Sequence, residues 1–329
     1  MLNPMFDAWA NLCAVNPFAW DFSHPETARV PTRHKTAVNS PSSMPPSLVS
    51  HRLATDAGSL DYKLYVPSTY QGQPAGLLIM LHGCGQDGQD FARGTGMNEL
   101  AEQYGCLVAY PEQSSSANSG KCWNWFEQAH HYRGGGEPAL IAGVARKIMD
   151  EYAIDPGKVF IAGLSAGGAM AVVLGRTYPD LFTAVGCHSG LAHGCAVGTG
   201  AAMQAMQYGD AAGAVDTDGS SPPMIVFHGD MDGTVHPRNG HGVVQQTIRL
   251  HGALGVAVEA HAEQGQSTGR NFTREVHRSS AGVVLVEHWT VHGSGHAWSG
   301  GNRRGSYTDA NGPDASGEMM RFFYEASGS

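Results

Sequence analysis

The sequence predicts an α/β protein with a mostly parallel central sheet and helices on both faces. Short apolar runs typical of buried strands alternate along the chain with segments of helical periodicity, and this alternation characterises such sheets. One apolar run, which begins at Val159, leads directly into the motif Gly163-x-Ser165-x-Gly167, and a small-residue helix follows. Strand, tight turn and helix in this order form a nucleophile elbow, in which a strained turn presents the serine Oγ at the edge of the sheet.

The composition is that of a globular chain without nucleic-acid-binding character. The 329 residues are 42% hydrophobic and carry a formal net charge of −9, so no basic surface favours nucleic acid as a partner. No apolar run approaches the length of a membrane span. No signal peptide is visible at the N-terminus, which favours a cytoplasmic location; secretion with a signal already removed is the alternative. None of the six cysteines forms a C-x-x-C pattern, so we expect no structural metal.

Two regions are expected along the chain. Residues 1–47 combine apolar residues at helical spacing around Trp9 with a Pro/Ser-rich linker. This amphipathic segment either docks on the core of its own domain or anchors the protein on an apolar surface or a partner. Residues 48–329 form the second region, a single α/β domain.

Ahead of the serine motif we expect a hairpin, two strands and two helices. Alternating apolar residues on either side of Asp56-Ala-Gly58 predict the antiparallel hairpin. The expected ranges are 49–66 for the hairpin, 77–81 and 106–110 for the strands, and 91–104 and 139–152 for the helices. After the motif we expect strands at 182–187, 224–227 and 283–291, a Gly/Ala-rich segment up to Pro223, and helices at 239–250 and 314–324.

Serine needs an adjacent base to act as a nucleophile, and the base needs a carboxylate to hold its tautomer. After Ser165, carboxylates follow the strand at 224–227, and histidines follow the strand at 283–291. Asp230 and Asp232 compete as the acid; spacing modestly favours Asp232, because the turn must swing the carboxylate back towards the histidine. Among 17 histidines, His296 is preferred as the base because it lies in a glycine-rich loop after the last strand.

A tetrahedral intermediate needs backbone donors for its oxyanion. The N–H of Ala166, directly after the serine, and the N–H of Cys84, in the loop after an earlier strand, are the candidates. Trp123, Trp125 and Trp298 are candidates for an apolar substrate wall, because the first two lie in a long loop and the third lies two residues from His296.

Five separated motifs resemble, in their order, those of the poly(3-hydroxybutyrate) depolymerase family of esterases. They are His82-Gly-Cys-Gly-Gln86, Cys122-Trp-Asn-Trp-Phe126, Gly163-Leu-Ser-Ala-Gly-Gly-Ala-Met170, His228-Gly-x-x-Asp232 and Gly295-His-Ala-Trp-Ser-Gly-Gly301. The resemblance covers roughly residues 48 to 326. It implies an α/β-hydrolase fold, a serine esterase without cofactor, the triad Ser165, Asp232 and His296, and a Cys84–Cys122 disulfide; two buried thiols are the alternative to that bond.

The resemblance implies a carboxylic ester hydrolase but does not select its substrate. The leading hypothesis is hydrolysis of polyhydroxyalkanoate, such as poly(3-hydroxybutyrate), or of its oligomers. Feruloyl or acetyl-xylan esterase activity is the alternative within the same chemistry. A non-catalytic protein that binds polymer granules is the alternative from another class, and an intact Ser–Asp–His set argues against it.

Overall fold

The computed structural model describes residues 48–56, 58–209 and 221–328. The amphipathic segment and linker that the sequence predicts over 1–47 therefore lie outside the described residues. No helix in the described ranges has the length and apolar character needed to cross a membrane.

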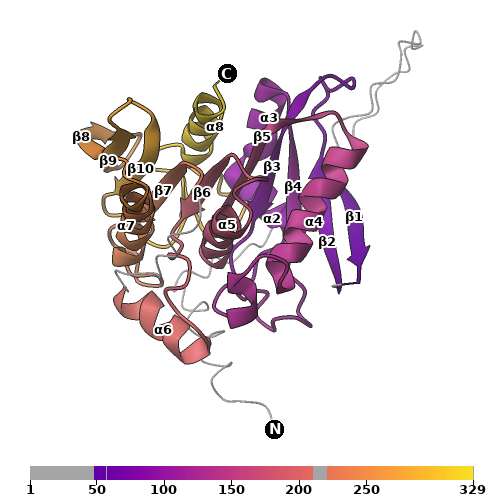
Figure 1. The fold of residues 1–329 in the computed structure, drawn as a ribbon, viewed down its shortest axis with the longest axis horizontal. Coiled ribbons are helices and arrows are strands. Elements are labelled where there is room, and N and C mark those ends of the chain that lie inside the picture. Colours follow the sequence, from indigo (N-terminus) through magenta and orange to yellow (C-terminus); the bar gives the residue numbers. More distant parts are fainter. Residues whose placement is uncertain (1–47, 57, 210–220, 329) are drawn as a thin grey trace, which may run out of the picture. The chain divides into compact units, whose positions relative to one another are not determined.

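A sheet of ten strands forms the centre of the described chain, in the order β1-β2-β4-β3-β5-β6-β7-β10-β9-β8 (Figure 1). The middle strands, from β4 to β10 in this order, pair in parallel. The edge strands pair antiparallel. The strand bounds are β1 Leu48–Thr55, β2 Gly58–Tyr65, β3 Ala75–Leu81, β4 Cys106–Glu112, β5 Ile154–Leu164, β6 Ala184–His188, β7 Met224–Gly229, β8 Val258–Gln266, β9 Asn271–Ser279 and β10 Val284–Val291.

Helices cover both faces of this sheet, as the sequence predicts. Successive residues of β6 show the two layers: a side chain at Gly175 of α5 would meet Val185, whereas a side chain at Gly186 would meet Met319 of α8. The helix bounds are α2 Gly88–Thr95, α3 Met97–Tyr104, α4 Gly136–Glu151, α5 Ala166–Thr177, α6 Thr199–Tyr208, α7 Arg238–Ala253 and α8 Ala315–Ala326, with a short 3-10 helix at Gln128–His131. The mostly parallel α/β architecture is thereby confirmed.

Two local expectations need correction, and one pair of strands was not expected. The single helix expected at 91–104 is two helices, because Gly96 has a φ of 62° and ends α2 in the left-handed region. The Gly/Ala-rich segment contains α6, whose alanines favour a helix once its ends are held. The antiparallel strands β8 and β9 are not predicted from the sequence, because β8 is solvent-exposed along most of its length and carries few apolar residues.

The central strands are the most deeply buried part of the chain. Every side chain from Leu77 to Leu81 of β3 is shielded from solvent, in agreement with the continuous apolar run. A rigid central sheet holds the loops at the carboxyl ends of β3, β5, β6, β7 and β10. Ligand sites of parallel sheets lie at that edge.

Candidate active site

Ser165 occupies the sharp turn between β5 and α5. Its φ of 58° lies in the left-handed region, which is strained for a residue with a side chain and is often found at functional sites. Its backbone N–H donates to the carbonyl of His188 at 2.8 Å. A side chain at Gly163 would collide with the backbone of Gly167, and a side chain at Gly167 would collide with the carbonyl of Leu81. The two glycines of the motif are therefore required for this turn to pack.

Asp232 and His296 come together across the carboxyl edge of the sheet. The Nδ1–H of His296 donates to Asp232 Oδ2 at 2.7 Å, which leaves Nε2 as the atom that can accept a proton. The backbone N–H groups of Thr234 and Val235 each donate to Asp232 Oδ1 at 2.9 Å. Within the described chain no hydrogen bond joins His296 Nε2 to the Ser165 hydroxyl; catalytic hydrogen bonds often tighten only when substrate binds.

The Asp232 carboxyl is held in its ionised form. Burial alone would raise its pKa, but hydrogen bonds from His228 and His296 outweigh burial and hold the pKa well below its usual range. His228 Nε2 lies 3.4 Å from Asp232 Oδ2 and donates to the carbonyl of Val235 at 2.8 Å. His228 thus supports the turn after β7.

Asp230, the competing acid, points to a different histidine. Its Oδ2 lies 2.9 Å from His292 Nδ1, and its Oδ1 accepts the backbone N–H of Gly293 at 2.7 Å. Both side chains of this pair are more than a third exposed, whereas the Asp232 carboxylate has no exposed surface. The turn after β7 therefore supplies the aspartates of two Asp–His pairs. Of these, only the pair of Asp232 with His296 is shielded from water.

His188, at the end of β6, was not singled out by sequence reasoning. Its carbonyl binds the Ser165 turn, and its Nε2 accepts the backbone N–H of Ser299 at 3.0 Å. The ring stacks on Trp298, with 5.0 Å between centroids, and burial lowers its pKa to about 3, so it stays neutral. His188 ties the serine turn to the loop that carries His296. His188 directly follows the strand that the sequence predicts at 182–187. A position just after a strand was also what made Asp232 a candidate, so the same criterion could have identified His188.

Asp309 holds the loop of His296 from the other side. Its Oδ2 accepts the hydroxyl of Ser294 at 2.9 Å and the Nε of Arg270 at 2.5 Å. Arg270 also donates to the carbonyl of Gly293. Asp309 lies in β12 (Thr308–Asp309), which pairs with β11 (Trp298–Ser299) directly after His296. These contacts fix a glycine-rich loop that would otherwise be mobile.

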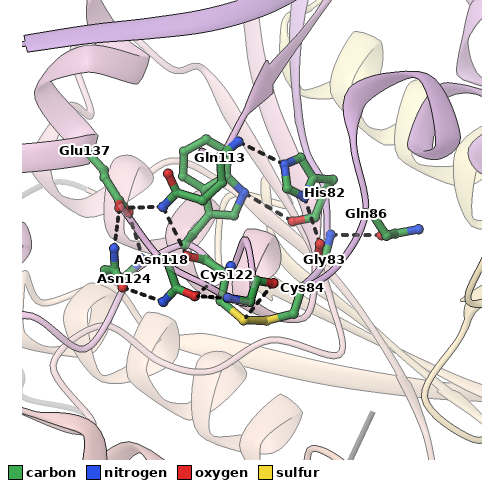
Figure 2. The surroundings of a disulfide bond; sticks show 11 residues. His82, Gly83, Cys84, Gln86, Gln113, Asn118, Cys122, Asn124 and Glu137 are labelled. Carbon is green, nitrogen blue, oxygen red and sulfur yellow. Dashed lines mark hydrogen bonds between the residues drawn. A yellow bond between two sulfur atoms is a disulfide. The ribbon is translucent and has the colours of Figure 1, made fainter. Parts of the chain in front are cut away.

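Cys84 and Cys122 form a disulfide, the pair that the family resemblance implies (Figure 2). The bond joins the loop after β3 to the long loop after β4, and the N–H of Gly85 donates to the carbonyl of Gly120 beside it at 2.9 Å. Among the described residues, neither the Cys84 N–H nor the Ala166 N–H donates to another group in a turn or cap. Ala166 begins α5, so its N–H belongs to the unpaired first turn of that helix.

Buried polar side chains hold the disulfide loop in place (Figure 2). Glu137 accepts the side-chain amides of Asn124 and Gln113 at 2.6 Å and 2.5 Å, and Gln113 also donates to the carbonyl of Cys122. His82 Nε2 accepts the backbone N–H of Gln113 at 3.1 Å. Burial lowers the pKa of His82 to about 4, so this ring stays neutral and supports the loop.

The three tryptophans proposed for a substrate wall are buried in this structure. Trp123, Trp125 and Trp298 are only 0%, 3% and 1% exposed. The indole N–H of Trp123 donates to the carbonyl of His82, and that of Trp298 donates to the hydroxyl of Ser316. A side chain without exposed surface cannot contact a substrate in this conformation. A role for Trp123, Trp125 or Trp298 in a substrate wall therefore stays a prediction, one that needs a conformation in which these side chains are exposed.

A parallel sheet with a strained serine turn after β5, and with Asp and His supplied after β7 and β10, defines the α/β-hydrolase class. The chain belongs to the family described as Esterase PHB depolymerase, whose model matches residues 60–269.

Two relatives of this chain are named for different esters. Poly(3-hydroxyalkanoate) depolymerase C of Paucimonas lemoignei is 33% identical over 255 residues, which is 74% of this chain and 59% of the relative. Acetylxylan esterase A of Talaromyces purpureogenus is 32% identical over 213 residues, which is 60% of this chain and 54% of the relative. The chain thus spans less than two thirds of the length of either. The structure of acetyl xylan esterase from Aspergillus awamori has the same fold, with a TM-score of 0.62, 23% identity, and coverage of 84% of this chain and 99% of that one.

Proposed function

We propose that this chain is a serine carboxylesterase that hydrolyses polyhydroxyalkanoate or its oligomers. The observation that carries the proposal is the 2.7 Å hydrogen bond between His296 Nδ1 and the shielded Asp232, at the sheet edge where Ser165 occupies a strained turn. A buried, ionised carboxylate holds the histidine in the tautomer that can take a proton from serine. No other arrangement at this edge combines these features within the described chain.

In the proposed mechanism Ser165 Oγ attacks the ester carbonyl carbon while His296 Nε2 takes the serine proton. The N–H groups of Cys84 and Ala166 stabilise the oxyanion of the tetrahedral intermediate. The intermediate collapses, the C–O bond to the alcohol breaks, and His296 protonates the leaving alcohol. Water then attacks the acyl-enzyme with His296 again as base, which releases the acid and restores the serine.

Two observations support an aliphatic polyester as substrate. The depolymerase from Paucimonas lemoignei matches a longer stretch of this chain than the acetylxylan esterase does. Met231, between the two aspartates, is 71% exposed and offers an apolar side chain next to Asp232 in the sequence. An exposed thioether next to the site suits a polyester chain better than a sugar.

The second candidate is an acetylxylan esterase, because several named relatives are esterases of that kind. Feruloyl esters remain the further option within the same chemistry. All three activities would use the same triad and differ only in the groups that receive the alcohol and acyl parts.

The disulfide supports a proposal on the compartment. Structural disulfides persist in oxidising environments and are rare in the cytosol. We therefore propose the secreted alternative over the cytoplasmic location that the N-terminus favours. Trapping the thiols of the source cells with an alkylating agent tests this, since a reduced Cys84–Cys122 pair in freshly lysed cells would restore the cytoplasmic expectation.

The test of function compares three substrates on one preparation: an amorphous poly(3-hydroxybutyrate) suspension, acetylated xylan and methyl ferulate. We expect release of hydroxybutyrate units by the wild type and a loss of about 10⁶-fold in kcat for Ser165→Ala. Ser116→Ala, an exposed serine of the long loop, is the matched control. Cleavage of acetylated xylan alone would keep the triad and overturn the substrate. Failure of a fluorophosphonate to label Ser165 would instead support a non-catalytic granule-binding protein.

A further inference from the structure

Outside the catalytic residues, the described chain holds one cluster of three metal-ligating side chains. One imidazole nitrogen of His241, one of His288 and one carboxylate oxygen of Glu275 lie within 4.8 Å of one another. None of these residues belongs to the motifs of the sequence analysis, and no C-x-x-C pattern marks them. The cluster is a product of the fold, since each residue comes from a different element.

Strand register places Glu275 and His288 side by side. The two residues are directly opposite each other in the antiparallel pair of β9 and β10, so their side chains share one face of the sheet. His288 Nδ1 lies 3.4 Å from Glu275 Oε2, a long contact for a hydrogen bond. The pair therefore has a fixed position on the sheet but a loose contact between its polar atoms.

His241 is the third member of the cluster and comes from a helix. It lies in α7, which packs on β10 and β7, and its ring meets the ring of His288 edge-on with 4.7 Å between centroids. His241 is exposed, Glu275 is partly buried and His288 is buried, so the cluster runs from solvent into the protein. An ion could therefore enter from the His241 side.

The second nitrogen of the His288 ring has no partner in the described part of the chain. His288 is only 1% exposed, and its Nε2 has no hydrogen-bond partner among the described residues. Buried imidazole nitrogens normally find a partner, and an orphaned one in a native fold calls for an explanation such as a bound ion or water. One of the two nitrogens of His288, Nδ1 beside Glu275 or the unpaired Nε2, is available to an ion.

We propose that His241, Glu275 and His288 bind a zinc ion. Two imidazoles and one carboxylate suit a borderline transition metal and not the hard cations Mg²⁺ and Ca²⁺, which prefer oxygen ligands. Tetrahedral zinc with ligand bonds near 2.1 Å needs its ligand atoms about 3.4 Å apart. The ligand atoms lie within 4.8 Å of one another, so zinc binding requires side-chain rotations that shorten these separations. Water completes the coordination on the solvent side.

The site would brace α7 against the edge of the sheet. β9 and β8 form the last two strands of the sheet order, and β8 is largely exposed. An ion shared by α7, β9 and β10 links these edge strands to the helix layer. Because the ion binds only where the three elements are folded together, zinc is expected to stabilise the native state by mass action.

The direct test is calorimetric titration of ZnCl₂ into untagged protein that has been stripped with a chelator. We expect one tight zinc per chain, and a dissociation constant raised at least about tenfold in His241→Ala and in Glu275→Gln, because each removes a ligand. His261→Ala, an exposed histidine of the neighbouring strand β8, is the matched control and should bind as the wild type does. Equal zinc affinity in wild type and both ligand variants would overturn the proposal.

Thermal unfolding gives an independent readout. Zinc should raise the Tm of the wild type and of His261→Ala but not of His241→Ala, and MgCl₂ should leave all three unchanged. Co²⁺ in place of zinc should give the visible absorption of a low-coordinate site in the wild type alone. A Tm rise of the same size in His241→Ala would show that the ion binds elsewhere, and the assignment would be rejected.

Discussion

The backbone N–H of Ser299 donates a 3.0 Å hydrogen bond to Nε2 of His188. Through this contact a buried imidazole connects β6 to the segment directly after His296. The carbonyl of the same histidine accepts the N–H of Ser165 at 2.8 Å. One residue thus sets the position of the serine turn and of the histidine loop, although it takes no part in the proposed chemistry.

Replacing His188 with phenylalanine should test this link. The ring can still stack on Trp298 and Phe227, but the Ser299 N–H loses its acceptor in a buried place. An unsatisfied buried donor costs about 1–3 kcal/mol, so the free energy of unfolding in urea should fall by that amount.

His51→Phe is the matched control for this substitution. His51 also stacks on an aromatic ring, that of Tyr62, at 5.2 Å between centroids, but it lies on the edge strand β1. The free energy of unfolding of His51→Phe should stay within about 0.5 kcal/mol of that of the wild type. If His188→Phe also kept wild-type kcat, the proposed positioning role of His188 would be wrong.

Stability should fall as the pH falls from about 6.5 towards 4. Burial lowers the pKa of His82 to about 4 and that of His188 to about 3, from an ordinary value of 6.5. Between these values the unfolded chain binds protons that the folded chain does not bind, so acid favours unfolding. Each histidine contributes up to about 1.4 kcal/mol per pH unit.

Urea unfolding at several pH values measures this dependence. Between pH 6 and 4, the free energy of unfolding of His188→Phe should fall less steeply with falling pH than that of the wild type. The difference in slope should be at most about 1.4 kcal/mol per pH unit. An unchanged slope in His188→Phe would mean that this ring is protonated in the folded protein.

Asp232 and Asp230 offer a matched pair within one turn. Asp232→Asn should lower kcat by about 10⁴-fold, because an amide no longer holds His296 in the required tautomer. Asp230→Asn should leave kcat within about threefold of the wild type, since Asp230 binds the exposed His292 and not His296. Steady-state kinetics on a small soluble ester measure both effects. Equal losses in the two variants would contradict the assignment of Asp232 as the acid.

Loss of the disulfide should affect both stability and rate. The bond closes a loop with a sequence separation of 38, so Cys84→Ala with Cys122→Ala should lower the free energy of unfolding by about 4 kcal/mol. The loop that carries the proposed oxyanion donor would then move more freely. We expect kcat to fall at least about tenfold in assays far below the Tm, where the folded fraction is constant. A normal kcat would show that hydrogen bonds alone hold the Cys84 N–H in place.

Local patterns in the sequence were sufficient for the elements around Ser165. The apolar run from Val159, the two glycines and the small-residue helix predict β5, the strained turn and α5, because each depends on residues close together in the chain. The same reasoning was insufficient for β8 and β9. A strand pair with one exposed side and few apolar residues has no distinct periodicity.

The sequence by itself determined the strands and helices that have a clear apolar pattern, the strained serine turn and the set of Asp and His residues at the carboxyl ends of the strands. Only the tertiary structure decided that Asp232 meets His296 while Asp230 meets His292, that the tryptophans lie beneath the surface, and that His241, Glu275 and His288 converge. The physical reason is that these contacts join residues far apart in the chain. Their distances follow from strand register and helix packing, which no local pattern of residues records.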